Sequence, residues 1–358
     1  MKVLKKLYLF TLLLAVLLFL DSCDNCDCVN SNSGYGPADK RLYFTAQALN
    51  SNFSSVFLFV EEDYQLERIA DSAQIFSPAS QDEKVVIFSQ ENNINKVILR
   101  NLFDTAKTVI ARKNSMYFGK PVISQNGDKV LYYSENELYL WKLNNVTGGA
   151  HLELLTSVYA NKMLPTFSKN DKYIAFAEKL DEATLNIKIV ETERLENIVW
   201  QKQINQNYKL DQKIQWLDRE NTLYFVLNDT TVCQYLVDNF EENLIKIPDA
   251  KNLGVISSSI SRDKKYIAFV SLQNELWIKN IQSGGFFRII ENNNKNKRFI
   301  APCWNWDNKK LCILVNEDSR KNSFWNLHCL ELDCQNNIPK INYNTLIFNN
   351  VVNVFWGI

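Results

Sequence analysis

The chain has 358 residues, and its 40 Lys and Arg residues balance its 40 Asp and Glu residues. Nucleic-acid binding depends on clustered basic side chains, so this balance argues against a nucleic acid as partner. Aromatic residues make up 12% of the chain, whereas Gly and Pro number only 10 and 7. This composition favours β-strands over disordered or collagen-like sequence.

Residues 1–22 have the pattern of a secretory signal peptide. Three lysines, Lys2, Lys5 and Lys6, precede an apolar stretch over residues 7–20. A helix over that stretch reaches about 21 Å, which is short of the ~30 Å hydrocarbon core of a bilayer. A basic start followed by a short apolar stretch is typical of an export signal rather than a permanent span.

The apolar stretch ends in residues 20–23, Leu-Asp-Ser-Cys, which resemble a bacterial lipobox. The resemblance implies that Cys23 is diacylated on its sulfur and becomes the mature N-terminus. Asp21 departs from the pattern, where a small or apolar residue is usual, so an ordinary cleaved signal and an uncleaved anchor stay as alternatives. Residues 23–37 are polar and rich in turn-formers, which predicts a flexible tether. Together these features imply a lipoprotein held at the inner or outer membrane of a bacterial envelope.

A short strand pattern recurs seven times between residues 38 and 358. Each copy closes on an aromatic or large apolar residue, and successive copies are 43 to 49 residues apart. An apolar segment and a polar hairpin precede the copies, and an alternating strand and another apolar run follow them. Four strands in about 45 residues is the period of a propeller blade. The closing residues are Phe44, Phe88, Tyr133, Phe176, Phe225, Phe269 and Leu314.

Residues 165–176 and 259–269 resemble the TolB-type, WD-repeat-like propeller motif. The resemblance implies an all-β fold over residues 38–358, a seven-bladed β-propeller of four-stranded antiparallel blades. If one copy of the repeat is misread, six or eight blades are the alternatives. The chain end, residues 349–358, resembles the segment from Ala301 to Trp306. We therefore predict that it forms the innermost strand of the first blade and closes the ring, which removes an exposed strand edge.

No residue set predicts catalysis. The only histidines are His151 and His328, both in or beside predicted strands. The chain contains no nucleophile elbow, zinc-protease helix, Walker motif or Rossmann glycine pattern. Most carboxylates fall in hairpin turns, where Asp has a structural role. We predict no catalytic residues, no metal ligands and no cofactor.

Seven cysteines remain besides Cys23. Cys303 and Cys312 flank one hairpin and Cys329 lies on the following strand, so a disulfide bond among these three is predicted. Buried packing of Cys312 is the alternative, because the repeat aligns it with apolar residues. Cys26 and Cys28 are too few for a zinc site. The residues aligned with Cys312 are Leu42, Val86, Leu131, Ile174, Leu223 and Ile267.

Trp304 and Trp306 alternate on one strand and so face the same side, which predicts a binding face at an inter-blade seam or channel mouth. Core packing is the alternative. We predict a non-catalytic scaffold that binds an envelope protein or a polysaccharide, and the resemblance favours a protein. The alternative function is an envelope hydrolase or lyase with a carboxylate-lined site on the propeller axis.

Overall fold

Residues 36–358 form one compact unit, and every described residue belongs to it. The predicted signal peptide, the tether and Cys23 lie outside the described residues. Within the described part, no helix is long and apolar enough to cross a membrane. The computed structural model describes residues 41–47, 54–61, 64–81, 83–104, 106–116, 118–135, 137–143, 150–157, 165–179, 184–205, 214–217, 221–228, 231–246, 253–294, 296–305, 307–318, 325–333 and 339–356.

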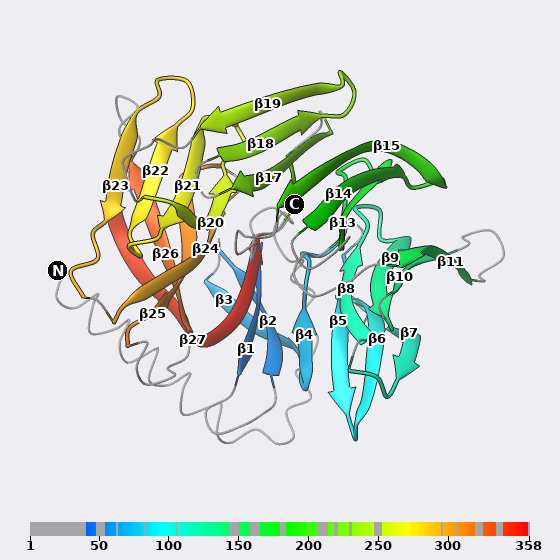
Figure 1. Cartoon of the computed structure of the whole chain (residues 1–358). Helices are drawn as coiled ribbons and strands as arrows, with labels where there is room; N and C mark the ends of the chain where they lie inside the picture. The colour runs from blue at the N-terminus through cyan, green and yellow to red at the C-terminus, as the bar shows by residue number, and fades with distance from the viewer. Residues whose placement is uncertain are drawn as a thin grey trace, which may run out of the picture. The chain divides into compact units, whose positions relative to one another are not determined.

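The regular elements of the described chain are all β-strands (Figure 1). They are β1 (Arg41–Gln47), β2 (Ser54–Val60), β3 (Gln65–Ala70), β4 (Ala73–Ile75), β5 (Lys84–Glu91), β6 (Ile94–Asn101), β7 (Lys107–Lys113), β8 (Phe118–Ile123), β9 (Lys129–Ser134), β10 (Glu137–Leu143), β11 (Ala150–Ser157), β12 (Thr166–Phe167), β13 (Tyr173–Lys179), β14 (Thr184–Glu191), β15 (Arg194–Asn205), β16 (Gln215–Leu217), β17 (Thr222–Asn228), β18 (Thr231–Leu236), β19 (Glu241–Lys246), β20 (Val255–Ile260), β21 (Tyr266–Ser271), β22 (Leu276–Asn280), β23 (Phe286–Ile290), β24 (Arg298–Trp304), β25 (Lys310–Asn316), β26 (Trp325–Asp333) and β27 (Lys340–Trp356).

Five sheets are four-stranded antiparallel meanders, formed by β4–β7, β8–β11, β12–β15, β16–β19 and β20–β23. The sixth has seven strands in the order β24-β25-β26-β27-β1-β2-β3. Its long strand β27 pairs with β26 from Lys340 to Val351 and with β1 from Val351 to Trp356, so Val351 has a partner on both sides. The described strands therefore fall into seven four-strand groups. Group 1 is the end of β27 with β1–β3, groups 2 to 6 are the five meanders, and group 7 is β24–β26 with the start of β27.

The seven repeat copies of the sequence lie in the second strands of the seven groups, β1, β5, β9, β13, β17, β21 and β25. The chain end pairs with β1, the partner that the sequence predicts. Leu42 lies opposite Trp356 and Phe44 opposite Val354. Figure 1 shows the red end of β27 beside the blue β1. A segment from one end of the chain thus supplies the first strand of a group that is otherwise built from the other end.

The hydrophobic core lies between successive groups, and each second strand packs one face on the group before it and the other on the group after it. On β21, Ile267 and Phe269 pack against group 5, whereas Ala268 packs against Leu311 and Ile313 of group 7. This alternation is the period-2 pattern of a strand with both faces buried.

These faces correct the sequence alignment by one residue in group 7. Ile313 packs against the preceding group, as Phe269 does. Ile313, and not Leu314, is therefore the counterpart of Phe269. Cys312 points to the opposite face, against group 1, and is therefore not equivalent to Ile267. The strand is apolar on both faces, so its pattern alone could not distinguish the two registers. Groups 2 and 3 show the same shift, since Val86 of group 2 packs towards group 3 and Tyr132 of group 3 packs towards group 2.

The turn between the first and second strands has one construction in five groups. A side-chain oxygen at its start accepts the backbone N–H at the start of the second strand, and the third residue after it has positive φ. At Gly127, with φ of 70°, glycine adopts this conformation without strain. The side chains that accept are Ser80, Ser124, Ser168, Ser261 and Asn305.

These turns are bonded from one group to the next. Asp171 in group 4 accepts the backbone N–H of Gln125 at 2.6 Å and of Asn126 at 2.8 Å, both in group 3. Burial raises the pKa of Asp171, and the two hydrogen bonds oppose that rise. Asn308 in group 7 likewise accepts the Arg262 N–H of group 6 at 2.8 Å. Because these contacts join turn to turn, the first-to-second turns of neighbouring groups lie at the same end of the unit.

Candidate binding site on the first strands

One cavity of about 350 Å³ lies where the first strands of the groups meet. Every group contributes to its lining, through β8, β12, β16, β20, β24, the end of β27 and the residues that follow β4. The volume is in the range of sites that hold small ligands or a side chain of a partner. Its lining is mostly apolar, and the lining residues that the argument uses are Ser77, Gln125, Lys169, Trp216, Ser257, Ser258, Arg262, Cys303, Trp304 and Trp356.

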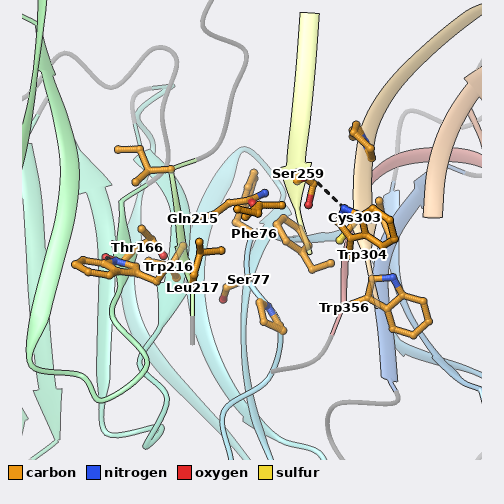
Figure 2. Close-up of a pocket in the computed structure, with 18 of the residues that line it drawn as sticks. Phe76, Ser77, Thr166, Gln215, Trp216, Leu217, Ser259, Cys303, Trp304 and Trp356 are labelled. Atoms are coloured by element: carbon orange, nitrogen blue, oxygen red, sulfur yellow. Dashed lines mark hydrogen bonds between the residues drawn. The ribbon is translucent and has the colours of Figure 1, made fainter. Parts of the chain in front are cut away.

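Three tryptophans occupy equivalent positions around the cavity, and each lies on the first strand of its group. Figure 2 shows Trp216 on one side and Trp304 and Trp356 on the other. The Trp304 indole stacks on Tyr266 of the preceding group, with ring centroids 6.2 Å apart, and donates its Nε1–H to the Ser259 carbonyl at 3.2 Å. These contacts tie one group to the next.

Trp216 repeats this arrangement two groups earlier. Its ring stacks on Tyr173 at 6.3 Å, and its Nε1–H donates to the Thr166 carbonyl at 3.2 Å. The two indoles therefore serve the packing between groups as well as the cavity wall. Trp304, which the sequence offers as a binding face, is only 5% exposed and lies in such a seam. Its predicted companion Trp306 lies outside the described residues.

The polar side chains of the wall mostly bond within the wall. Ser257 Oγ accepts the Ala301 N–H at 3.1 Å, and Ser77 Oγ accepts the Ile123 N–H at 3.2 Å. The buried Tyr224 hydroxyl lies 2.9 Å from Ser258 Oγ. Burial raises the pKa of Tyr224, which keeps that hydroxyl protonated and able to donate.

Lys169 and Arg262 are the only charged residues in the described lining, and both lie in first-to-second turns. None of the described lining residues is Asp or Glu. The carboxylate-lined axial site of the alternative prediction thus has no acid in this part of the wall. No group of three or more metal-ligating side chains suited to a metal ion occurs among the described residues. His328 lies elsewhere, on β26, with Nδ1 at 3.0 Å from Asn344 Oδ1. The His151 side chain is outside the described part.

Three exposed aromatic residues, which the sequence analysis did not single out, lie in third-to-fourth turns. They are Tyr64 in group 1, Phe103 in group 2 and Phe240 in group 5. In an antiparallel meander the first-to-second and third-to-fourth turns lie at the same end. These aromatic residues therefore share an end with Lys169 and Arg262. Their sequence signal was a large aromatic side chain inside a polar turn.

The three cysteines of group 7 lie on neighbouring strands in register. Cys303 on β24 is opposite Cys312 on β25, and Cys312 is opposite Cys329 on β26. All three are thiols in the structure. The sequence placed them near one another, and the structure adds that Cys312 is the shared neighbour.

No family model and no curated protein matches this sequence. Solved structures do resemble it. The β-propeller domain of Cps50 (Swd1) from Myceliophteria thermophila is 13% identical, with a TM-score of 0.55, and the match covers 77% of this chain and 97% of that one. The described chain has a β-propeller fold. The C-terminal WD40 domain of Sif2 is 12% identical, with a TM-score of 0.54 and coverage of 85% and 81%. TolB from Acinetobacter baumannii is 14% identical, with a TM-score of 0.47 and coverage of 89% and 83%.

Propellers with unrelated sequences perform unrelated functions, so this likeness concerns the fold alone. It agrees with the all-β, WD-repeat-like architecture that the repeat predicts.

Proposed function

We propose that this protein is a non-catalytic, lipid-anchored scaffold of a bacterial cell envelope, whose propeller binds a protein partner at one end of its axis. The propeller has seven blades, which are the seven four-strand groups, and β27 closes it. The observation that carries the proposal is the cavity to whose wall all seven groups contribute. Propellers present loops around such an axis on a rigid framework, which suits partner binding.

Closure is supported by contacts between groups 7 and 1 that repeat those of another pair. Lys310 at the start of β25 forms an ion pair with Glu61, in the third-to-fourth turn of group 1. Lys129 at the start of β9 lies 3.9 Å from Glu193, in the same turn of group 4. Leu314 of group 7 also shares one buried cluster with residues of β1. The last and first groups thus meet as ordinary neighbours do.

A protein partner is favoured over a polysaccharide or a substrate. Inside the cavity the three tryptophans are nearly buried and offer no open aromatic platform for a sugar. Catalysis by paired acids needs carboxylates, and the described wall contains none. Exposed aromatic side chains are enriched in protein interfaces, and Tyr64, Phe103 and Phe240 lie at one end with two basic residues. That end is the proposed binding face.

The anchor rests on the sequence, through the signal-like residues 1–22 and Cys23, with the tether placing the propeller in the periplasm or on the cell surface. In cells fed a labelled fatty acid, Cys23→Ser is expected to abolish label and to leave an uncleaved precursor. Cys26→Ser and Cys28→Ser are matched controls that keep the label. Labelled Cys23→Ser protein would contradict the anchor.

The binding face is tested by photo-crosslinking in intact cells. A photoreactive phenylalanine analogue replaces Tyr64, Phe103 or Phe240, one at a time, in the full chain. All three are expected to capture the same protein, because they lie at the same end. Tyr343, an exposed tyrosine on the outer part of β27, is the matched control and is expected to capture little of it.

Equal capture from Tyr343, or a different protein from each position, would overturn the binding face. Capture of polysaccharide in place of protein would overturn the choice of partner.

A further inference from the structure

The three thiols of group 7 form a row that crosses the sheet from the cavity outwards. Cys303 lies on the first strand and lines the cavity, and Figure 2 shows it beside Trp304. Cys312 lies opposite it on the second strand, and Cys329 lies opposite Cys312 on the third. Directly opposite residues of antiparallel strands are ~4.5–5.5 Å apart, which is within the Cα separations of disulfides.

The ends of the row cannot bond directly. Neighbouring strands are about 4.8 Å apart, so Cys303 and Cys329 are separated by about 9.6 Å, beyond the ~7 Å limit for a disulfide. Only Cys312 can therefore bond to either of the others, and to one at a time.

Accessibility differs along the row. Cys312 is fully buried, whereas Cys303 and Cys329 are partly buried. All three pack on the face that meets group 1. Burial raises the pKa of Cys312, and a hydrogen bond with Cys329 raises it further. A buried thiol of high pKa is a poor first nucleophile, so a reagent in the cavity meets Cys303 first.

We propose that Cys303, Cys312 and Cys329 form a thiol–disulfide exchange site, in which Cys303 reacts with a small-molecule disulfide in the cavity and Cys312 then passes the bond to Cys329. The site is independent of the binding function proposed above.

The exchange balances in three steps. The Cys303 thiolate attacks the small disulfide, forms a mixed disulfide and expels one small thiolate, which takes the proton that Cys303 lost. Cys312 then attacks the Cys303 sulfur and releases the second small thiol, again with transfer of its proton. Cys329 attacks the Cys312 sulfur and transfers its proton to Cys303, which leaves as a thiol. The small disulfide gains two electrons, and Cys312 and Cys329 lose two between them.

Tryptic peptides distinguish these bonds, because the cysteines fall in residues 299–309, 311–320 and 322–340. The full-length protein carries Cys334→Ser, since Cys334 shares a peptide with Cys329. After exposure to oxidised glutathione, non-reducing mass spectrometry is expected to find 311–320 linked to 322–340.

Single variants test the route in that background. In Cys329→Ser the link is expected between peptides 299–309 and 311–320. In Cys312→Ser, peptides 299–309 and 322–340 are expected to stay unlinked. In Cys303→Ser the bond between Cys312 and Cys329 is expected to form about tenfold more slowly, because the thiol that lines the cavity and reacts first is gone. Cys233→Ser is the matched control and changes nothing, since Cys233 is buried opposite Phe225 and Leu244 rather than another cysteine.

Three results would overturn the site. They are no linked peptide in the folded protein, a direct link between Cys303 and Cys329 in Cys312→Ser, and an unchanged rate in Cys303→Ser. Circular dichroism establishes that each variant is folded. If Cys312→Ser does not fold, the Cys303→Ser and Cys329→Ser variants still decide the test, because both positions are only partly buried.

Discussion

Val354→Asp is expected to abolish cooperative folding, whereas Val352→Asp, two residues earlier on β27, leaves the protein folded. Val354 is 1% exposed and lies opposite Phe44, while Val352 is 46% exposed. An unpaired carboxylate at a buried position costs several kcal/mol. That loss is comparable with the whole stability of a domain, about 5–15 kcal/mol. Circular dichroism and urea unfolding measure both variants.

Deletion of residues 349–358 is expected to have the same effect by a different route. It removes the buried side chains of Val351, Val354 and Trp356, each of which contributes about 1.5–3 kcal/mol by burial. It also leaves the backbone of β1 unpaired on one edge. A truncated protein with a normal unfolding transition would contradict the role assigned to β27, as would equal tolerance of Asp at positions 352 and 354.

Trp304→Ala is expected to lower the free energy of unfolding by about 3–5 kcal/mol, the usual cost of removing a large buried aromatic side chain. The change removes the stack on Tyr266 and leaves the Ser259 carbonyl without its indole donor. Trp304→Phe keeps a ring and loses the hydrogen bond, so about 1–3 kcal/mol is expected. Urea unfolding gives both values.

Trp277→Ala is the control for the loss of an indole. Trp277 is half-buried on β22, and its Nε1–H donates to Glu275 at 3.1 Å within the same group. A smaller loss is expected there, because Trp277 is less buried than Trp304 and, although its ring packs against group 5, its indole bonds within its own group. Equal losses for Trp277→Ala and Trp304→Ala would show that the deeper burial of Trp304 and its hydrogen bond to the preceding group add nothing.

The repeat was predictable because its signals are local. An apolar strand after a polar turn recurs at a fixed period, so the seven second strands and the partner of the chain end could be read from sequence. The turns follow the same logic, since the Ser168 side chain accepts a hydrogen bond from the backbone N–H of Tyr173, only five residues later. Such signals need no knowledge of the tertiary structure.

Side-chain facing was not predictable in the same way. Cys312 was aligned with Ile267 because both are apolar, yet they face opposite groups. A strand buried on both sides has no polar face to fix its register. Strand β27 completes group 7 with its first part and group 1 with its last part. The first of these roles was not predictable either, because it depends on pairing between separate segments of the chain. The common end of the exposed aromatic turns, and the place of Cys312 as the shared neighbour of Cys303 and Cys329, emerged only when the strands were paired.

Hydrogen exchange followed by mass spectrometry tests the closed propeller most directly, because it reports on backbone pairing in the unaltered protein. If β27 joins the last blade to the first, the amides of residues 351–356 exchange as slowly as those in the centre of β25, and residues 41–47 are protected with them. Rapid exchange across residues 351–356, with β25 still protected, would mean that the chain end is frayed and the ring open.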